Sequence, residues 1–125
     1  MAKKLFPDGT EVTPFYVRAI RSGPLVFVSG TTSLDSKGRV QGKDAAEQTI
    51  ITMRKIEAAL KKAGCKLSDL TQMTIFVTDI RDMGAVSKAL GKALKGSVVT
   101  STLVAVTALA AVSYTHLTLP TNREV

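Results

Sequence analysis

Apolar residues first cluster in two short runs near the N-terminus. Residues 16–21 and 25–29 are rich in Val, Ile and aromatic side chains, and Ser22-Gly23-Pro24 separates them. Such runs have strand propensity, whereas Gly and Pro supply the conformations of tight turns. The pattern predicts a β-hairpin whose second strand ends at Gly30.

The next apolar pattern has the period of a helix. Apolar side chains recur every three or four residues, at Ala46, Ile50, Met53, Ile56, Leu60 and Ala63. Asp44 and Glu47 have the spacing of a capping box, and Gly64 suits the position just after a helix. The sequence therefore predicts a helix that begins after Asp44 and ends before Gly64.

Three further elements follow in the second half of the chain. Met73 to Val77 is a nearly continuous apolar run, typical of a strand covered on both faces. Asp79 or Asp82 can cap a second helix that runs through Lys95, and residues 101–109 again have strand composition. The order β-β-α-β-α-β predicts an α+β fold of two layers, a mixed sheet with both helices on one face.

Composition changes this picture little. The 125 residues include 17 Lys and Arg against 10 Asp and Glu, a net charge of +7, and the basic residues are scattered. A positive field favours anionic small molecules or plain solubility, and the absence of Trp argues against a nucleic-acid binder that stacks bases. Cys65 stands alone, so no disulfide framework or thiolate metal cluster is expected. With no signal peptide or membrane span in the pattern, a cytoplasmic protein is expected.

Several motifs together resemble the reactive-intermediate deaminase (Rid, YjgF-like) family. They are Gly23-Pro24-Leu25-Val26-Phe27-Val28-Ser29-Gly30, Glu47-Gln48-Thr49, Ala63-Gly64, Thr74-Ile75-Phe76-Val77-Thr78-Asp79 and Ser101-Thr102-Leu103-Val104. The likeness covers roughly residues 14 to 110, with matching spacing. It implies a chorismate-mutase-like fold, a homotrimer, and a pocket for a small anionic metabolite between neighbouring subunits.

The resemblance also implies a chemistry. The best-known branch hydrolyses a 2-enamine or 2-imine acid to a 2-keto acid and ammonia, with an Arg that anchors the carboxylate and a Glu that relays protons. Tyr16 and the Ser29-Gly30 pair match pocket positions of that branch, and Ser87 stands where it has an Asn. Thr100 occupies the position of the anchoring Arg, and a Thr cannot bind a carboxylate as an ion pair. These six positions, with Arg18 included, are the candidate ligand-binding residues.

Arg18 is the one nearby cation that could compensate. It lies two residues after Tyr16, so on an extended strand both side chains would point to the same face. The alternative interpretation is a surface Arg on a strand edge.

The C-terminus departs from the family pattern. Residues 111–121 resemble the conceptual translation of a transposon-type sequencing adapter, which leads to the hypothesis of a Rid-like domain over residues 1–110 and a non-native tail over 111–125. The final family strand would then be missing or replaced, with Pro120 ending any substitute pairing. No Asp or Glu lies between Asp82 and Glu124, so the relay Glu is expected to be absent, and His116 is interpreted as irrelevant.

Three functions stay open from the sequence. The leading one is a deaminase-like Rid protein of impaired or atypical activity that binds an anionic metabolite. The others are an RNA-cleaving translation inhibitor, and a non-catalytic ligand-binding or holdase-like module. No phosphate-binding Gly loop or metal-ligand spacing is present, so no cofactor and no metal are predicted.

Overall fold

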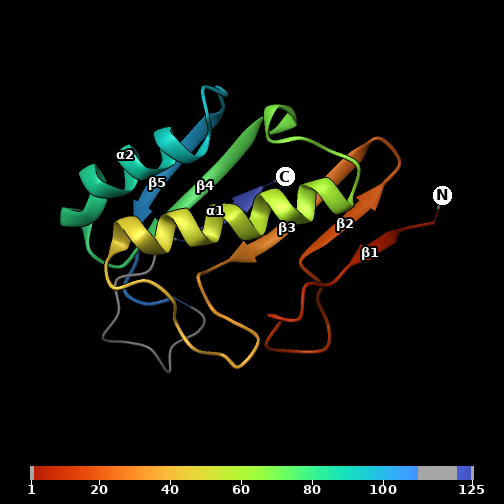
Figure 1. Cartoon of the computed structure of the whole chain (residues 1–125), viewed down its shortest axis with the longest axis horizontal. Helices are drawn as coiled ribbons and strands as arrows, with labels where there is room; N and C mark the ends of the chain where they lie inside the picture. Colours follow the sequence, from red (N-terminus) through yellow and green to blue (C-terminus); the bar gives the residue numbers. More distant parts are fainter. Residues whose placement is uncertain (1, 110–120, 125) are drawn as a thin grey trace.

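In the computed structural model, which describes residues 2–109 and the backbone of residues 121–124, one mixed sheet carries two helices on one face (Figure 1). The strands are β1 (Lys4–Phe6), β2 (Ala19–Ser22), β3 (Leu25–Thr31), β4 (Gln72–Val77), β5 (Thr100–Ala105) and β6 (Thr121–Glu124). The helices are α1 (Ala45–Lys62) and α2 (Met83–Ala93), with 3-10 turns η1 (Leu67–Asp69) and η2 (Ile80–Asp82). The predicted α+β class and the single helical layer are confirmed.

The sheet order is β1-β2-β3-β6-β4-β5. Strands β4 and β5 pair in parallel, and every other neighbouring pair is antiparallel. The β2–β3 hairpin is confirmed, with Ser22 opposite Leu25 and Gly23 in the turn at φ +61°. The positive φ explains the Gly, because side chains disfavour that backbone conformation.

The prediction for α1 is confirmed at both ends. The Asp44 carboxylate accepts a hydrogen bond of 2.9 Å from the Glu47 N–H, which caps the first turn. After the last turn, Gly64 adopts φ +86°, and the Cys65 N–H donates to the Leu60 carbonyl at 2.7 Å. This is the arrangement in which a C-terminal Gly satisfies the last helical carbonyls.

The second helix is shorter than predicted. The Asp79 carboxylate caps η2 by accepting from the Arg81 N–H at 2.9 Å, and α2 begins only at Met83. The chain then leaves the helix after Ala93 through Lys95 and Gly96, both at positive φ. Gly96 therefore ends the segment as expected, but the regular helix stops two residues before Lys95.

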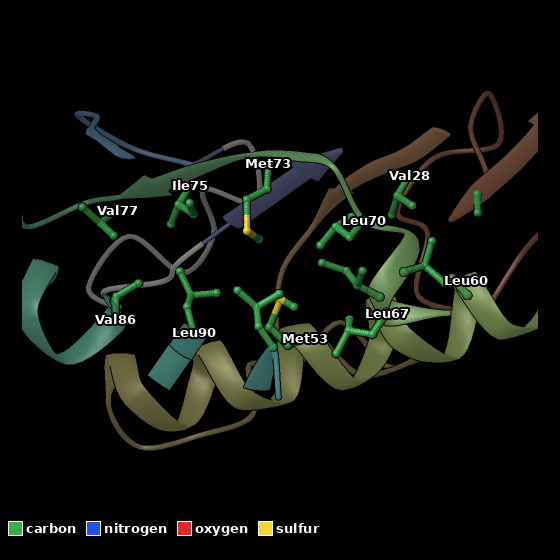
Figure 2. Close-up of a cluster of buried hydrophobic side chains, with 14 of the residues drawn as sticks. Val28, Met53, Leu60, Leu67, Leu70, Met73, Ile75, Val77, Val86 and Leu90 are labelled. Carbon is green, nitrogen blue, oxygen red and sulfur yellow. The ribbon is translucent and has the colours of Figure 1, made fainter. Parts of the chain in front are cut away.

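The core lies between the helices and the sheet. Figure 2 shows Met53 and Leu60 of α1, Val86 and Leu90 of α2, and Met73, Ile75 and Val77 of β4 pointing toward one another. All are less than a tenth exposed, so each contributes roughly 1.5–3 kcal/mol of hydrophobic stabilisation.

One burial prediction is wrong, and one apolar stripe is only partly buried. Strand β4 is fully buried only on its helix side, because Thr74 and Phe76 on the other face stay half-buried. On α1, Ala46 and Ile50 belong to the apolar stripe but are also only half-buried. Both departures have one cause, since no second layer covers the open face of the sheet or the outer side of the helices within the described part of the chain.

The strands nearest the two chain termini also differ from the prediction. Strand β1 was not foreseen, and β6 lies in the middle of the sheet between β3 and β4, starting directly after Pro120. The expectation that Pro120 ends any pairing of the residues before it stays a prediction, because those residues and Pro120 lie outside the described part of the chain. The hypothetical boundary after Ala110 and residues 111–120, with His116, lie outside the described residues.

Candidate functional site

Tyr16 and Arg18 lie in a loop, and the prediction of a strand over residues 16–21 is wrong at its start. Strand β2 begins at Ala19, and the preceding residues fold around two carboxylates. Glu11 accepts hydrogen bonds from the N–H groups of Asp8 and Arg18, each at 2.9 Å. Because the Glu11 carboxylate binds these two main-chain N–H groups, the segment is held in a turn and does not continue the strand.

Arg18 is the most constrained side chain of this loop. Its guanidinium Nε donates to the Asp8 carboxylate at 3.1 Å, and one terminal nitrogen donates to the Thr10 hydroxyl at 3.0 Å. The other terminal nitrogen donates to the Gly30 carbonyl at 2.8 Å and to the Thr31 hydroxyl at 3.1 Å. The residue is 2% exposed, so the interpretation as a surface Arg on a strand edge is wrong.

The partners of Arg18 stay charged over a wide pH range. Burial alone would raise the pKa of the Asp8 carboxyl, but hydrogen bonds from Thr10 and the charges of Arg18 and Lys55 outweigh it and hold the pKa below its ordinary value. Burial likewise opposes the ionised form of Glu11, and its bonds to main-chain N–H groups again lower the pKa. The loop is thus built on an ion pair between the buried Arg18 and the half-buried Asp8, with every guanidinium nitrogen in use.

Three further candidate residues surround this network. The Tyr16 ring lies 5.8 Å from the Arg18 guanidinium carbon, and its hydroxyl accepts from the Val12 N–H at 3.0 Å. The Ser29 hydroxyl donates to the Val17 carbonyl at 2.6 Å, next to Gly30. Tyr16, Ser29 and Gly30 are all half-buried, so one edge of each remains open to solvent.

Ser87 and Thr100 are not brought to this corner. Ser87 is exposed on α2, and Thr100 is exposed at the start of β5, where its hydroxyl donates to the Thr71 carbonyl at 2.9 Å. Strands β6 and β4 lie between β3 and β5, which separates Ser29 from Thr100 by about 14 Å at the usual strand spacing. Within one chain Thr100 therefore lies apart from the corner that holds Tyr16, Arg18, Ser29 and Gly30, and Ser87 lies on the surface of α2.

A pocket beside the Arg18 network was not foreseen from the sequence. It encloses about 280 Å³ and is lined by Phe6, Pro7, Asp8, Thr10, Lys55, Ala58, Ala59 and Lys62. Lys55 donates to the carbonyls of Thr32 and Leu34 at 2.8 and 2.9 Å. Burial and the nearby Arg18 charge lower the pKa of Lys55 to about 8. The sequence does not predict this burial, because Lys55 lies outside the apolar stripe of α1.

The face of the sheet opposite the helices carries an apolar row that no other described residue covers. Val28, Ala19 and Phe6 point to the core, so the alternation of side chains puts Phe27, Ile20 and Leu5 on the other face. These three residues are paired across β3, β2 and β1 as one row. Phe27 is 41% exposed and Leu5 is 55% exposed. An apolar row of this kind favours burial against a partner surface.

Among the described residues, no group of three or more His, Cys, Asp or Glu side chains is placed to hold a metal ion. None of the helices in that part of the chain is both long and apolar enough to cross a lipid bilayer.

The fold and the site together define a class: a small α+β domain with parallel crossover helices on one sheet face and polar loop residues beside an open apolar face. The family model described as Endoribonuclease L-PSP matches residues 10–114. The mitochondrial protein mmf2 of Schizosaccharomyces pombe is 33% identical over 90 residues, which cover 72% of this chain and 71% of that protein. The chain therefore belongs to the Rid (YjgF, endoribonuclease L-PSP) family, as its motifs indicated.

Other relatives agree on the family and vary in coverage. The 2-iminobutanoate/2-iminopropanoate deaminase of Salmonella typhimurium is 29% identical over 72 residues, 58% of this chain and 56% of that enzyme. The chain thus spans little more than half the length of this curated relative.

Solved structures show the same fold. Rv2704 of Mycobacterium tuberculosis, a member of the YjgF/YER057c/UK114 family, is 32% identical with a TM-score of 0.79, over 99% of this chain and 100% of that one. TdcF of Escherichia coli with bound serine has a TM-score of 0.81 at 21% identity, over 96% of this chain and 95% of that one, and this likeness concerns the fold alone.

Proposed function

We propose that this chain is a deaminase-like Rid protein that binds a small anionic metabolite between the subunits of a homotrimer, with weak imine hydrolysis. The observation that carries the proposal is the separation of about 14 Å between Ser29 and Thr100 within one chain. Tyr16, Ser29 and Gly30 form one wall, and a second copy would bring Thr100 and Ser87 to it.

The open sheet face supports the assembly. The row of Leu5, Ile20 and Phe27 would be buried if copies packed through this face, and its burial would contribute to association in proportion to the apolar area removed from water. The helices would then remain on the outside, as Figure 1 indicates for the single chain.

The chemistry is the hydrolysis of a 2-imino acid. Water adds to the imine carbon, the C–N bond breaks, and a 2-keto acid and ammonia leave. Thr100 carries a neutral hydroxyl, already donated to the Thr71 carbonyl, at the position where the resemblance implies a charged anchor, so the carboxylate is bound weakly. Arg18 contributes to this wall chiefly by holding the Gly30 carbonyl, because its nitrogens are already engaged. The sequence expectation of a cytoplasmic location stays a prediction.

Two measurements test the proposal. Light scattering gives the solution mass, which should be that of three chains, and Phe27→Asp should shift it to one chain. Val98→Asp introduces the same charge at a more exposed loop residue away from the row, and it should leave the mass unchanged. Ammonia release from freshly generated 2-iminopropanoate should exceed the spontaneous rate by a modest factor. A wild-type chain that is already a monomer, like both variants, would contradict the proposal. RNA cleavage with no ammonia release would also contradict it and would favour the RNA-cleaving alternative.

A further inference from the structure

A groove runs along the outer side of the two helices, away from the sheet. One cavity of about 520 Å³ and a second of about 320 Å³ share Ile50, Arg54 and Lys92 as lining residues. The shared residues make the two cavities one continuous depression between α1 and α2. None of the candidate ligand-binding residues lines it, so the groove is independent of the proposed imine site.

The floor of the groove is apolar. It is formed by Ala46, Ile50 and Ile51 of α1 and by Ala85 and Ala89 of α2. Ile50 and Ile51 are only half-buried, so part of each apolar side chain faces the groove. On α2 the lining residues Ala85 and Ala89 have short side chains, which leave the groove open. The departure of Ala46 and Ile50 from the core is thus the origin of this surface. Apolar side chains left open in a groove favour burial by a partner.

The rim of the groove is positively charged. Arg54, Lys88 and Lys92 are exposed and form no ion pair with another residue of the described part of the chain. The nearby acids are occupied, because Glu47 pairs with Lys43 at 3.6 Å and Glu57 with Lys95 at 3.4 Å. The groove therefore presents three uncompensated cations around an apolar floor.

We propose that this groove binds an amphipathic helix of a partner protein, with apolar residues on one face and acidic residues on its flanks. From Ala46 to Glu57 the groove extends about 16 Å, the length of roughly three helical turns. An apolar floor with charged rims is the surface that such a helix recognises. A small ligand would stay mostly in solvent in a trough this open, and no aromatic residue lines it to stack a nucleic-acid base.

The test uses a designed probe. A fluorescein-labelled peptide of about four turns, with Leu on one face and Glu on both flanks, is titrated with the full chain and followed by anisotropy. The double variant Lys88→Glu/Lys92→Glu reverses two rim charges on α2 and should weaken binding roughly tenfold or more. The double variant Lys37→Glu/Lys61→Glu makes the same change in net charge at exposed positions away from the groove, and should weaken binding less than about threefold.

Four outcomes would overturn the proposal. The probe does not bind, or a peptide of the same composition with its apolar face broken up binds equally well. A third outcome is that both double variants bind the probe more weakly by the same factor, which indicates that the probe is attracted by net charge alone. A polyuridylate competitor that displaces the probe, and whose own binding is lost in Lys88→Glu/Lys92→Glu, would assign the groove to nucleic acid. Equal urea midpoints of the variants and wild type show that folding is unchanged.

Discussion

The Arg18 guanidinium donates a hydrogen bond of 2.8 Å to the carbonyl of Gly30, twelve residues later in the chain. This bond fastens the N-terminal loop to the end of β3, directly beside Ser29. Since the same guanidinium pairs with Asp8, one buried cation determines how the loop, and with it Tyr16, is placed against β3. The conformation of the proposed ligand wall thus depends on an ion pair that does not itself face the ligand.

Replacing Arg18 should destabilise the fold strongly. In Arg18→Met the Asp8 carboxylate loses its partner and the Gly30 carbonyl loses a donor, so unfolding in urea should become easier by about 3–5 kcal/mol. Arg81→Met removes an exposed Arg that pairs with Asp79 at 2.6 Å, and its urea midpoint should stay close to that of wild type. Similar midpoints for the two variants would show that the Arg18 network adds little.

Lys55 should make stability depend on pH in the alkaline range. Its pKa is about 8 in the folded chain, against an ordinary 10.5, so the folded state releases a proton that the unfolded state still binds. Stability therefore rises as the pH goes from about 8 toward 10.5. The difference in unfolding free energy between wild type and Lys55→Met isolates this contribution and should shift in favour of wild type over that range. A difference that stays constant, or shifts toward the variant, would contradict the assignment.

Two glycines should respond to Ala in opposite directions. Gly91 lies in α2, and no atom beyond its own stretch of helix lies within 4 Å of an added Cβ. Gly91→Ala should therefore stabilise the protein by about 0.4–1 kcal/mol. Gly42 has φ +94°, and an added Cβ would lie 2.9 Å from the Gln48 nitrogen at the start of α1. Gly42→Ala should therefore destabilise by more than about 1 kcal/mol. Thermal unfolding of both variants measures the two effects, and a shift of the same sign in both would contradict the argument.

The parts of the fold that the sequence predicts are those set by local interactions. The Asp44 cap, the apolar stripe of α1 and the Gly23 turn each depend on residues within a few positions, so pattern and structure agree there. The buried position of Arg18 could not be predicted, because its partners Asp8 and Gly30 are distant in sequence and come together only when the sheet forms. Burial of Lys55 depends in the same way on a loop more than twenty residues away.

The candidate site shows the same limit. Residue types and spacing, read through the family resemblance, predict Tyr16, Ser29 and Thr100 as ligand-binding residues, but they do not predict the distance between them. Only the strand order shows that Thr100 lies on another part of the sheet. Ile50 belongs to the apolar stripe of α1 but is only half-buried. The sequence pattern does not show which residues of such a stripe another layer will cover.

Thr100→Arg should raise imine hydrolysis if the missing anchor limits it. An Arg at the start of β5 would supply a charge-assisted bond to the substrate carboxylate, worth about 1.5–3 kcal/mol, so kcat/KM for 2-iminopropanoate should increase roughly tenfold to a hundredfold. The loss of the hydroxyl bond to Thr71 is small beside this, because that bond is exposed. Thr102→Arg is the matched control, since Thr102 is exposed on the same face of β5 two residues later and adds the same charge. Ammonia release measured at several salt concentrations separates the two variants: a gain confined to Thr100→Arg supports the anchor, whereas equal gains in both indicate general attraction of the anion and contradict it.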